Sequence, residues 1–470
     1  MVAITAAGCG SGETRDAFST VGTLDFANRL HIPPLAKSTK DPQGVLNFDL
    51  TAEPGTSRFL PGKATPTWGY NGAFLGPTIR ARRGDIVRLS VRNSTQEGTT
   101  IHWHGMRLPS VSDGGPHQPI AAGDTWTTEW KLDQPAATLW YHPHPHGKTE
   151  QQVLRGLAGM FIIDTNEPLT AALPSLYGVD DFPVIVQDRT FEEDGSLRTG
   201  SRAMTGLVGD TLLVNGTYNP YVAVTTQAIR LRLLNASSAR VYNFGFSDDR
   251  KFCVIGSDGG LLHAPVTATR IQLSPGERAE VVVRFLPGES TVFRSFPQEL
   301  GMGQAFNNGA GGNDVLDVLE FQAADMLSPS MPLPDVLTAG TEVHTNHAVA
   351  TRDFILNGTL INGRTLDMDR IDTVVRAGSA EIWNISNIDH RAHNFHIHDM
   401  QFKILDIDGE KPAPEFAGWK DTVFLPVRTT ARLALTFGSH TAPSLPYMYH
   451  CHMLWHEDQG MMGQYAIEQA

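Results

Sequence analysis

Three adjacent residues near the C-terminal end, His450-Cys451-His452, are followed by His456 and Met461 and together offer three kinds of metal ligand. Thiolate, imidazole and thioether donors favour copper, and two histidines, one cysteine and a weak axial methionine form the donor set of blue-copper electron-transfer sites. Successive side chains of an extended segment point to opposite faces, so we expect Cys451 to face away from its two neighbours. One segment can therefore serve two metal sites.

The chain has 18 histidines, and ten of them form four groups. These groups are His102-Trp103-His104, His142-Pro143-His144, His393 with His396 and His398, and His450 with His452 and His456. Their aromatic and β-branched surroundings predict strands, on which the two imidazoles of a pair share one face. The simpler alternatives are surface histidines beside a buried cysteine, and a structural zinc site. Zinc needs only four ligands, and the groups supply many more.

A threefold internal repeat predicts the architecture. Its copies are Tyr70-Asn71-Gly72 leading to Asn93, Val214-Asn215-Gly216 leading to Asn235, and Leu356-Asn357-Gly358 leading to Asn387. Each copy consists of short alternating stretches broken by glycine, proline and asparagine, a pattern typical of an antiparallel β-sandwich. We therefore expect an all-β chain with domains over residues 31–170, 171–330 and 331–470, preceded by a flexible N-terminus over residues 1–30.

The repeat also predicts where the ligands lie. Histidine groups follow Asn93 and Asn387, whereas residues 236–246, which follow Asn235, contain no histidine. The middle domain should therefore carry no ligands. The histidine pairs of the first and third domains are then expected to meet at the interface between these two domains.

The four motifs, in this order, resemble those of the multicopper oxidases, the family of laccases, cuprous oxidases, bilirubin oxidases and spore-coat laccases. The resemblance covers nearly the whole chain and implies three cupredoxin-like Greek-key domains with four copper ions. It implies a type 1 copper at His393, Cys451, His456 and Met461, a type 2 copper at His102 and His396, and a type 3 pair at His104, His142, His144, His398, His450 and His452. Relatives that serve as structural or division proteins have lost these residues.

The resemblance also implies a reaction: electrons leave a reductant one at a time, and four of them reduce dioxygen to water. Phenols or aromatic amines are the expected reductants, with Cu(I) or bilirubin as alternatives. The 13 methionines are scattered, which disfavours Cu(I). Asp113 and Glu457 resemble the family's acids near the copper cluster and are predicted to relay protons. The simpler alternatives are a turn residue at Asp113 and a solvated charge at Glu457. A non-catalytic copper-binding or cell-envelope assembly protein is the alternative of another class.

Composition and termini limit the partners and the location. A formal net charge of -13 argues against nucleic acid, and no apolar run approaches the ~18 residues of a transmembrane segment. The segment Ala6-Ala7-Gly8-Cys9 resembles the end of a bacterial lipoprotein signal, with Cys9 as the lipid anchor. The alternative is an unstructured N-terminus as far as Leu30. We expect an exported monomer, periplasmic or at the cell surface.

Overall fold

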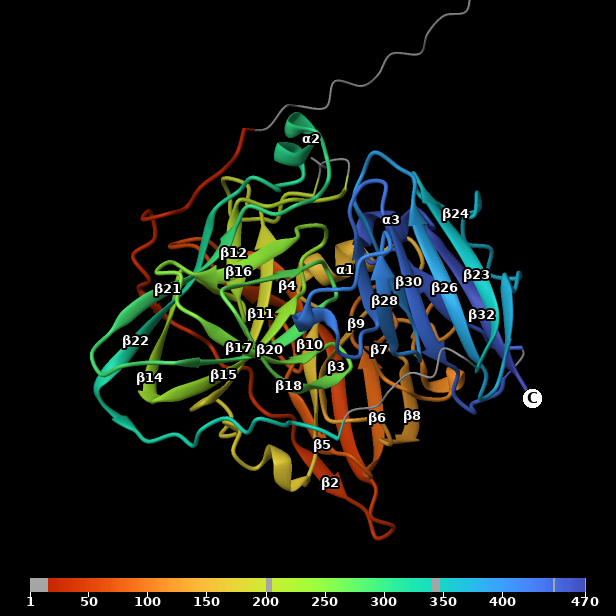
Figure 1. Ribbon diagram of the computed structural model, residues 1–470, viewed down its shortest axis with the longest axis horizontal. Helices are drawn as coiled ribbons and strands as arrows, with labels where there is room; N and C mark the ends of the chain where they lie inside the picture. Colours follow the sequence, from red (N-terminus) through yellow and green to blue (C-terminus); the bar gives the residue numbers. More distant parts are fainter. Residues whose placement is uncertain (1–15, 200–204, 340–346, 443, 470) are drawn as a thin grey trace, which may run out of the picture.

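The computed structural model describes residues 16–199, 205–339, 347–442 and 444–469. Within these ranges the strands form six sheets, which pair into three β-sandwiches, each around its own hydrophobic core. In Figure 1 the first sandwich is orange, the second is green at the left, and the third is blue at the right. This architecture confirms the predicted fold of three cupredoxin-like domains.

The first domain contains two sheets around a core that includes Trp103 and Tyr141. One sheet has the order β2 (Ser38–Lys40), β3 (Leu46–Ser57), β6 (Ile86–Asn93) and β8 (Thr125–Lys131), with β4 (Thr65–Tyr70) paired to β3. The other has the order β5 (Ile79–Arg82), β10 (Gly159–Asp164), β9 (Ala137–His142) and β7 (His102–His104). Its helices are η1 (Ser110–Ser112), α1 (Thr149–Arg155) and η2 (Pro168–Thr170).

The second domain has the larger sheets. One has the order β1 (Asn28–Arg29), β14 (Pro220–Thr226), β22 (Leu316–Ser328), β21 (Ser290–Phe296), β16 (Tyr242–Phe246) and β19 (Arg270–Leu273). The other has the order β13 (Thr217–Tyr218), β12 (Thr211–Val214), β11 (Asp181–Arg189), β15 (Ala228–Asn235), β20 (Arg278–Arg284), β17 (Phe252–Ser257) and β18 (Gly260–Ala268). The short helix α2 (Gln304–Gly309) precedes β22.

The third domain repeats the two-sheet plan. One sheet has the order β24 (Leu360–Ile361), β23 (Ala348–Asn357), β26 (Ala380–Asn387), β30 (Thr430–Thr436) and β28 (Phe402–Ile407). The other has the order β25 (Thr373–Arg376), β32 (Met462–Glu468), β31 (Tyr447–His450), β27 (His393–Ile397) and β29 (Thr422–Leu425). The helices are η4 (Pro414–Phe416) and α3 (Leu454–Asp458).

The internal repeat recurs as a repeated strand pairing. In each domain one strand, β6, β15 or β26, pairs in parallel with an earlier strand and antiparallel with a later one. Each of these strands ends in the asparagine of the sequence repeat, Asn93, Asn235 or Asn387. The side-chain amide of each asparagine donates to the backbone carbonyl of a later segment of its own domain, at 2.9, 2.9 and 3.1 Å. The repeated asparagine therefore makes the same type of connection to a distant segment in all three domains.

In the third domain, the Asn-Gly pair that matches the repeat in structure lies five residues after the pair that the internal repeat predicted. Asn71 and Asn215 adopt positive φ angles of 55° and 50°, and their side-chain oxygens accept from Thr51 and Ile185 of the neighbouring strands. In the third domain Asn362 has this role, with φ 52° and a bond of 2.7 Å from a strand amide. Leu356-Asn357-Gly358 instead joins β23 to β24, so a similar short motif misled the alignment.

Part of the N-terminal segment, within residues 16–30, packs on the second domain, whereas flexibility was predicted for residues 1–30. Strand β1 adds in parallel to β14 of the second domain, and Phe26 and Leu30 are buried. Unpaired amides at a sheet edge provide the pairing sites for such an added strand. Cys9 lies outside the described residues. Among those described, no helix is long and apolar enough to cross a membrane.

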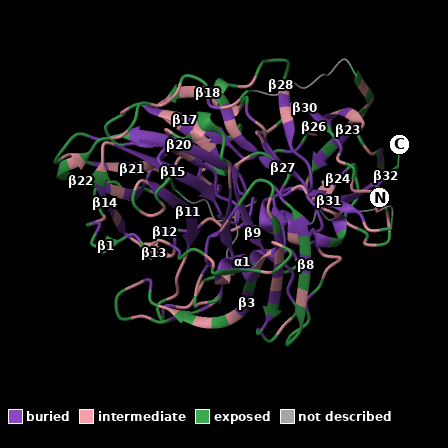
Figure 2. Cartoon of the chain, turned by 90° about the horizontal axis from the view of Figure 1, so that it is seen from below, coloured by how far each residue is buried: buried purple, intermediate pink, exposed green. Residues whose placement is uncertain are grey.

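The domains also pack on each other. A separate hydrophobic cluster joins the first and second domains through Trp140 and Met160 on one side and Ile185 and Leu234 on the other. In Figure 2 the buried strands, including β9, β11 and β27, lie in the interior of the molecule, and the exposed segments lie mainly at its periphery. The histidine-bearing strands are therefore enclosed by all three domains.

Candidate metal centres

The predicted cysteine site is formed within the third domain. Cys451 follows β31, His393 begins β27 and His456 lies in α3. The Cys451 Sγ atom lies 3.6 Å from His393 Nδ1 and 3.5 Å from His456 Nδ1. Met461 is fully buried in the same core, and its backbone bonds to Cys451 and His456 at 3.1 and 3.0 Å. The structure thus brings together the four residues that were predicted as one ligand set.

One carboxylate that the sequence analysis missed orients this site. Asp389 Oδ2 lies 3.1 Å from His393 Nε2, so it accepts the proton of that nitrogen and leaves Nδ1 to face the sulfur. Burial raises the pKa of Asp389, but hydrogen bonds from His393 and from the backbone of His390 outweigh it, and the pKa lies well below the usual range. The sequence offered one signal, an acid four residues before a predicted ligand.

The eight other predicted ligands meet between the first and third domains, and all of them are buried. His102 pairs with His142 across β7 and β9, and His396 pairs with His450 across β27 and β31. Rings from the two domains stack against each other: His102 on His398 and His104 on His396, each with centroids 3.7 Å apart. The two domains therefore place equivalent strand pairs face to face, and the structure brings the predicted interface ligands together.

Only the first histidine pair lies wholly within a strand, as all were predicted to do. β9 ends at His142 and β31 ends at His450, so His144 and His452 come after their strands. The rings of His450 and His452 still lie 5.4 Å apart on the side of the first domain, while Cys451 contacts His393 and His456. Cys451 and its two neighbours therefore point in the opposite directions that were predicted, although the strand assignment was too long.

The ring nitrogens are arranged to accept metal ions. The Nε2 atoms of His144 and His398 each lie 3.2 Å from His450 Nε2. Seven further ring nitrogens are buried and have no hydrogen-bond partner: His102 Nε2, His104 Nδ1, His142 Nε2, His144 Nδ1, His396 Nε2 and both nitrogens of His452. Buried polar atoms nearly always have a partner, and imidazole nitrogens suit copper. The donor set therefore fits a cluster of copper ions.

Six imidazoles of this cluster favour the neutral form that metal binding requires. Burial, reinforced in most of them by neighbouring histidines, lowers the pKa well below its usual value in His104, His142, His144, His398, His450 and His452. A neutral imidazole keeps a lone pair for the metal. Burial also raises the pKa of the Cys451 thiol, to about 12, so this group must lose a proton when it becomes a thiolate ligand.

Asp113 bridges the two ligand-bearing domains. Its carboxylate Oδ2 accepts from His398 Nδ1 at 2.8 Å, and its backbone carbonyl accepts from His102 Nδ1 at 3.0 Å. It also lies in the tight turn that was the simpler alternative. Gly114 has φ 75°, and a Cβ there would lie 1.7 Å from the carbonyl oxygen of Ile101. The turn therefore places the acid against the histidines.

Glu457 lies at the other side of the histidines. Its carboxylate oxygens lie 3.5 Å from His144 Nδ1 and 3.3 Å from His450 Nδ1. The residue is 0% exposed, so the alternative of a solvated charge is wrong. Burial raises the pKa of Glu457 well above its usual value, which favours the protonated form of its carboxyl group.

Comparisons with known proteins agree with this donor set. Three family models, each described as multicopper oxidase, match residues 51–168, 181–308 and 327–470. The chain is 36% identical over 444 residues to "Multicopper oxidase mco" of Staphylococcus haemolyticus, covering 94% of this chain and 92% of the relative. The chain belongs to the multicopper oxidase family. Members of this family are copper-binding oxidoreductases.

Two other similar proteins show the range of roles on this fold. This multicopper oxidase is 35% identical over 451 residues to the cell division protein FtsP of Salmonella typhimurium, covering 94% of this chain and 93% of the relative. The structure of the present chain is similar to that of a laccase from Pediococcus acidilactici, with a TM-score of 0.85, 35% identity and 94% coverage of both chains. Family membership alone therefore leaves the reductant open.

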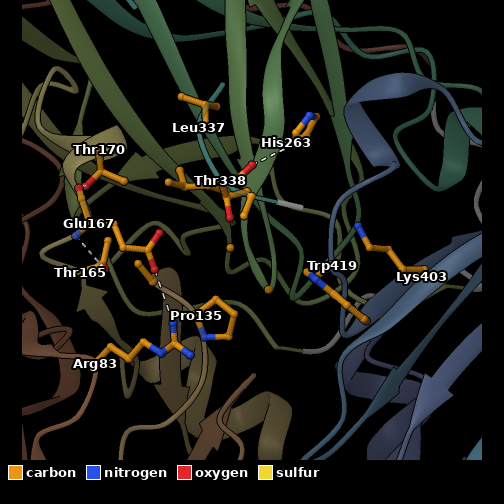
Figure 3. A pocket seen from close by; sticks show the side chains of 15 residues that line it. Arg83, Pro135, Thr165, Glu167, Thr170, His263, Leu337, Thr338, Lys403 and Trp419 are labelled. Atoms are coloured by element: carbon orange, nitrogen blue, oxygen red, sulfur yellow. Dashed lines mark hydrogen bonds and ion pairs between the residues drawn. The ribbon is translucent and has the colours of Figure 1, made fainter. Parts of the chain in front are cut away.

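A separate cavity of about 530 Å³ lies where the three domains meet. Figure 3 shows Arg83 and Pro135 of the first domain, His263 of the second, and Lys403 and Trp419 of the third around it. None of the predicted ligands lines this cavity. The histidine cluster is therefore not part of it.

Proposed function

We propose that this multicopper oxidase is a laccase-type enzyme that oxidises phenols or aromatic amines one electron at a time and reduces dioxygen to water. The observation that carries the proposal is the complete donor set, in which buried ring nitrogens without hydrogen-bond partners gather beside a separate cysteine site. A protein that had lost the chemistry would have no reason to retain this arrangement, because buried polar atoms without partners destabilise a fold.

The proposal assigns the ligands as follows. A type 1 copper is held by His393, Cys451, His456 and Met461, a type 2 copper by His102 and His396, one type 3 copper by His144, His398 and His450, and the other by His104, His142 and His452. The division of the type 3 ligands rests on the close approach of three Nε2 atoms in the first set. Copper ions held by these residues would supply the one-electron oxidation of the reductant and the four-electron reduction of dioxygen.

The chain contributes connection, orientation and protons. Cys451 of the first site is bonded directly to His450 and His452 of the cluster, so two peptide links join the two centres. Asp113 orients His398 and, in this proposal, passes protons together with Glu457. These two acids lie against different histidines, so each serves a different side of the cluster. Four protons are needed for every dioxygen reduced to water.

The alternative of another class is a non-catalytic cell-envelope protein, which the likeness to FtsP raises. The retained donor set favours the enzyme. Cuprous oxidase activity is the alternative reductant, and bilirubin is a further substrate to test. We also propose that the protein is exported and monomeric, with a lipid anchor at Cys9.

Oxygen uptake tests the proposal. Protein loaded with copper is supplied with a methoxyphenol, with Cu(I) or with bilirubin, with and without added copper salt. Four coppers per chain and rapid uptake with the phenol, independent of added copper, support a laccase. Uptake that needs added copper supports a cuprous oxidase. Protein that binds copper but consumes no oxygen with any of the three contradicts the enzymatic proposal.

A further inference from the structure

The second domain supplies no predicted ligand, yet one of its segments, residues 274–278, packs against the histidine cluster. Asn394 links the segment to the third domain, because its amide donates to the carbonyl of Pro275 at 2.8 Å while its oxygen accepts from the His452 amide at 2.6 Å. Gly276 packs flat against the cluster. A Cβ at this position would lie 3.1 Å from the His452 ring and 3.2 Å from the His104 ring.

Arg278 extends this contact into all three domains. The residue is 1% exposed. Within the second domain it donates to the carbonyls of Gly276 and Asp258 at 3.0 and 2.9 Å. It also donates to the carbonyl of Thr138 in the first domain at 3.1 Å, and to both carboxylate oxygens of Asp421 in the third domain at 2.8 and 2.6 Å. Such a two-point contact fixes the plane of a carboxylate as well as its position.

Asp421 in turn bonds to two histidines of the cluster. Its Oδ1 atom lies 3.0 Å from His104 Nε2, and its backbone carbonyl lies 2.9 Å from His396 Nδ1. Gly105 makes room for the pair, since a Cβ there would lie 2.6 Å from both Arg278 Nη2 and Asp421 Oδ2. No short sequence motif relates these residues, because 143 positions separate Arg278 from Asp421.

This contact determines which nitrogen His104 offers to a metal. An ionised carboxylate only accepts hydrogen bonds, so His104 Nε2 carries the proton and Nδ1 keeps the lone pair. Nδ1 of His104 is the atom that is buried without a partner. Four other rings are reversed: they donate Nδ1 to a backbone carbonyl and present Nε2, namely His102, His142, His396 and His450.

We infer that Arg278 of the ligand-free second domain is a positioning residue for the copper cluster, because it fixes Asp421 so that His104 presents Nδ1. The inference rests on the proposed function for the presence of cluster copper. It gives the second domain a role in the metal site: the domain completes the hydrogen-bond frame that the two ligand-bearing domains share.

The variant Arg278→Lys tests the inference in the full chain. Lysine keeps the positive charge but cannot make the two parallel bonds to Asp421. We expect the affinity of the cluster for copper, measured by competition with a chelator of known affinity, to fall about 10- to 100-fold, the usual effect of losing a partner that orients a ligand. The EPR signals of the cluster should change, whereas the blue absorbance of the cysteine site should be retained.

Arg240→Lys is the matched control. Arg240 is also fully buried in the second domain and bonds to Asp188 and Asp314, away from the histidines. Thermal unfolding of the copper-free proteins reports any general loss of stability in either variant. Asp421→Asn breaks the same contact from the third domain and is expected to lower cluster affinity in the same way, which keeps the test valid if Arg278→Lys does not fold.

The outcomes separate this inference from the proposed function. Cluster affinity in Arg278→Lys or Asp421→Asn equal to that of the wild type overturns the role of Arg278, and so does an equal loss in Arg240→Lys. Wild-type protein that leaves the histidine cluster unfilled contradicts the proposed function itself. A selective loss in Arg278→Lys, with the control unchanged, supports both.

Discussion

Replacement of Asp113 by asparagine isolates the proton-handling role of this acid. An asparagine oxygen can still accept from His398 Nδ1, now 2.8 Å from the carboxylate, and the backbone bond to His102 is untouched. The ring orientations should therefore survive, while the group can no longer gain and lose a proton. Positioned general acids and bases contribute about 10²- to 10⁴-fold. We expect dioxygen reduction to slow about 100-fold, which corresponds to about 2.7 kcal/mol in the barrier.

The assay combines two measurements on copper-loaded protein. Steady-state oxygen uptake with a saturating methoxyphenol gives the overall rate. Anaerobic reduction followed by mixing with oxygen gives the rate at which the blue absorbance returns. Both rates should fall in Asp113→Asn, whereas the blue absorbance of the resting protein should be unchanged, because Asp113 bonds to His398 and His102 of the cluster while the cysteine site is built around Cys451.

Asp188→Asn is the control for Asp113→Asn. Asp188 is a buried aspartate of the second domain that accepts from Arg240, so its replacement also removes a buried charge. This variant should lose stability but keep its rate of dioxygen reduction. If Asp113→Asn turns over as fast as the wild type, Asp113 has no part in proton supply and the assignment fails.

Three further predictions follow from the buried donors. Cys451→Ser should abolish both the blue absorbance and the oxidase activity; turnover of a phenol by this variant would contradict the whole assignment of the sites. Because burial raises the pKa of the Cys451 thiol to about 12, copper loading at pH 7 should release about one proton from it. Calorimetry in buffers of different ionisation enthalpy measures this release, and Cys451→Ala should lack it. Finally, six cluster histidines have lowered pKa values in the fold. The unfolded chain therefore binds more protons below about pH 6.5, and each such histidine removes up to ~1.4 kcal/mol of unfolding free energy per pH unit as the pH falls. The thermal midpoint of the copper-free protein should be lower at pH 5.5 than at pH 7.5, and an equal or higher midpoint would refute the argument.

Local patterns in the sequence predicted most of the fold. Alternating apolar residues and the asparagines at 93, 235 and 387 predicted three β-sandwiches, because each asparagine bonds to a later segment of its own domain. The repeat pattern predicted the wrong residue in the third domain, where two similar Asn-Gly motifs lie close together. Asn357 matched the repeat by sequence, but Asn362 occupies the equivalent turn, since strand pairing with β23 selects the position. The strand at residues 28–29 was also missed, because its partner lies about 190 residues away.

The candidate sites divide in the same way. The sequence by itself determined the donor types, their grouping and the absence of ligand groups from the middle domain, because imidazole, thiolate and thioether chemistry belongs to the residues themselves. Only the tertiary structure decided which ring nitrogens are free. Asp389, Asp421 and Arg278 set the orientation of the rings through hydrogen bonds, two of which cross domain boundaries. Hydrogen-bond direction depends on distance and angle in space, so a pattern along the chain does not contain it.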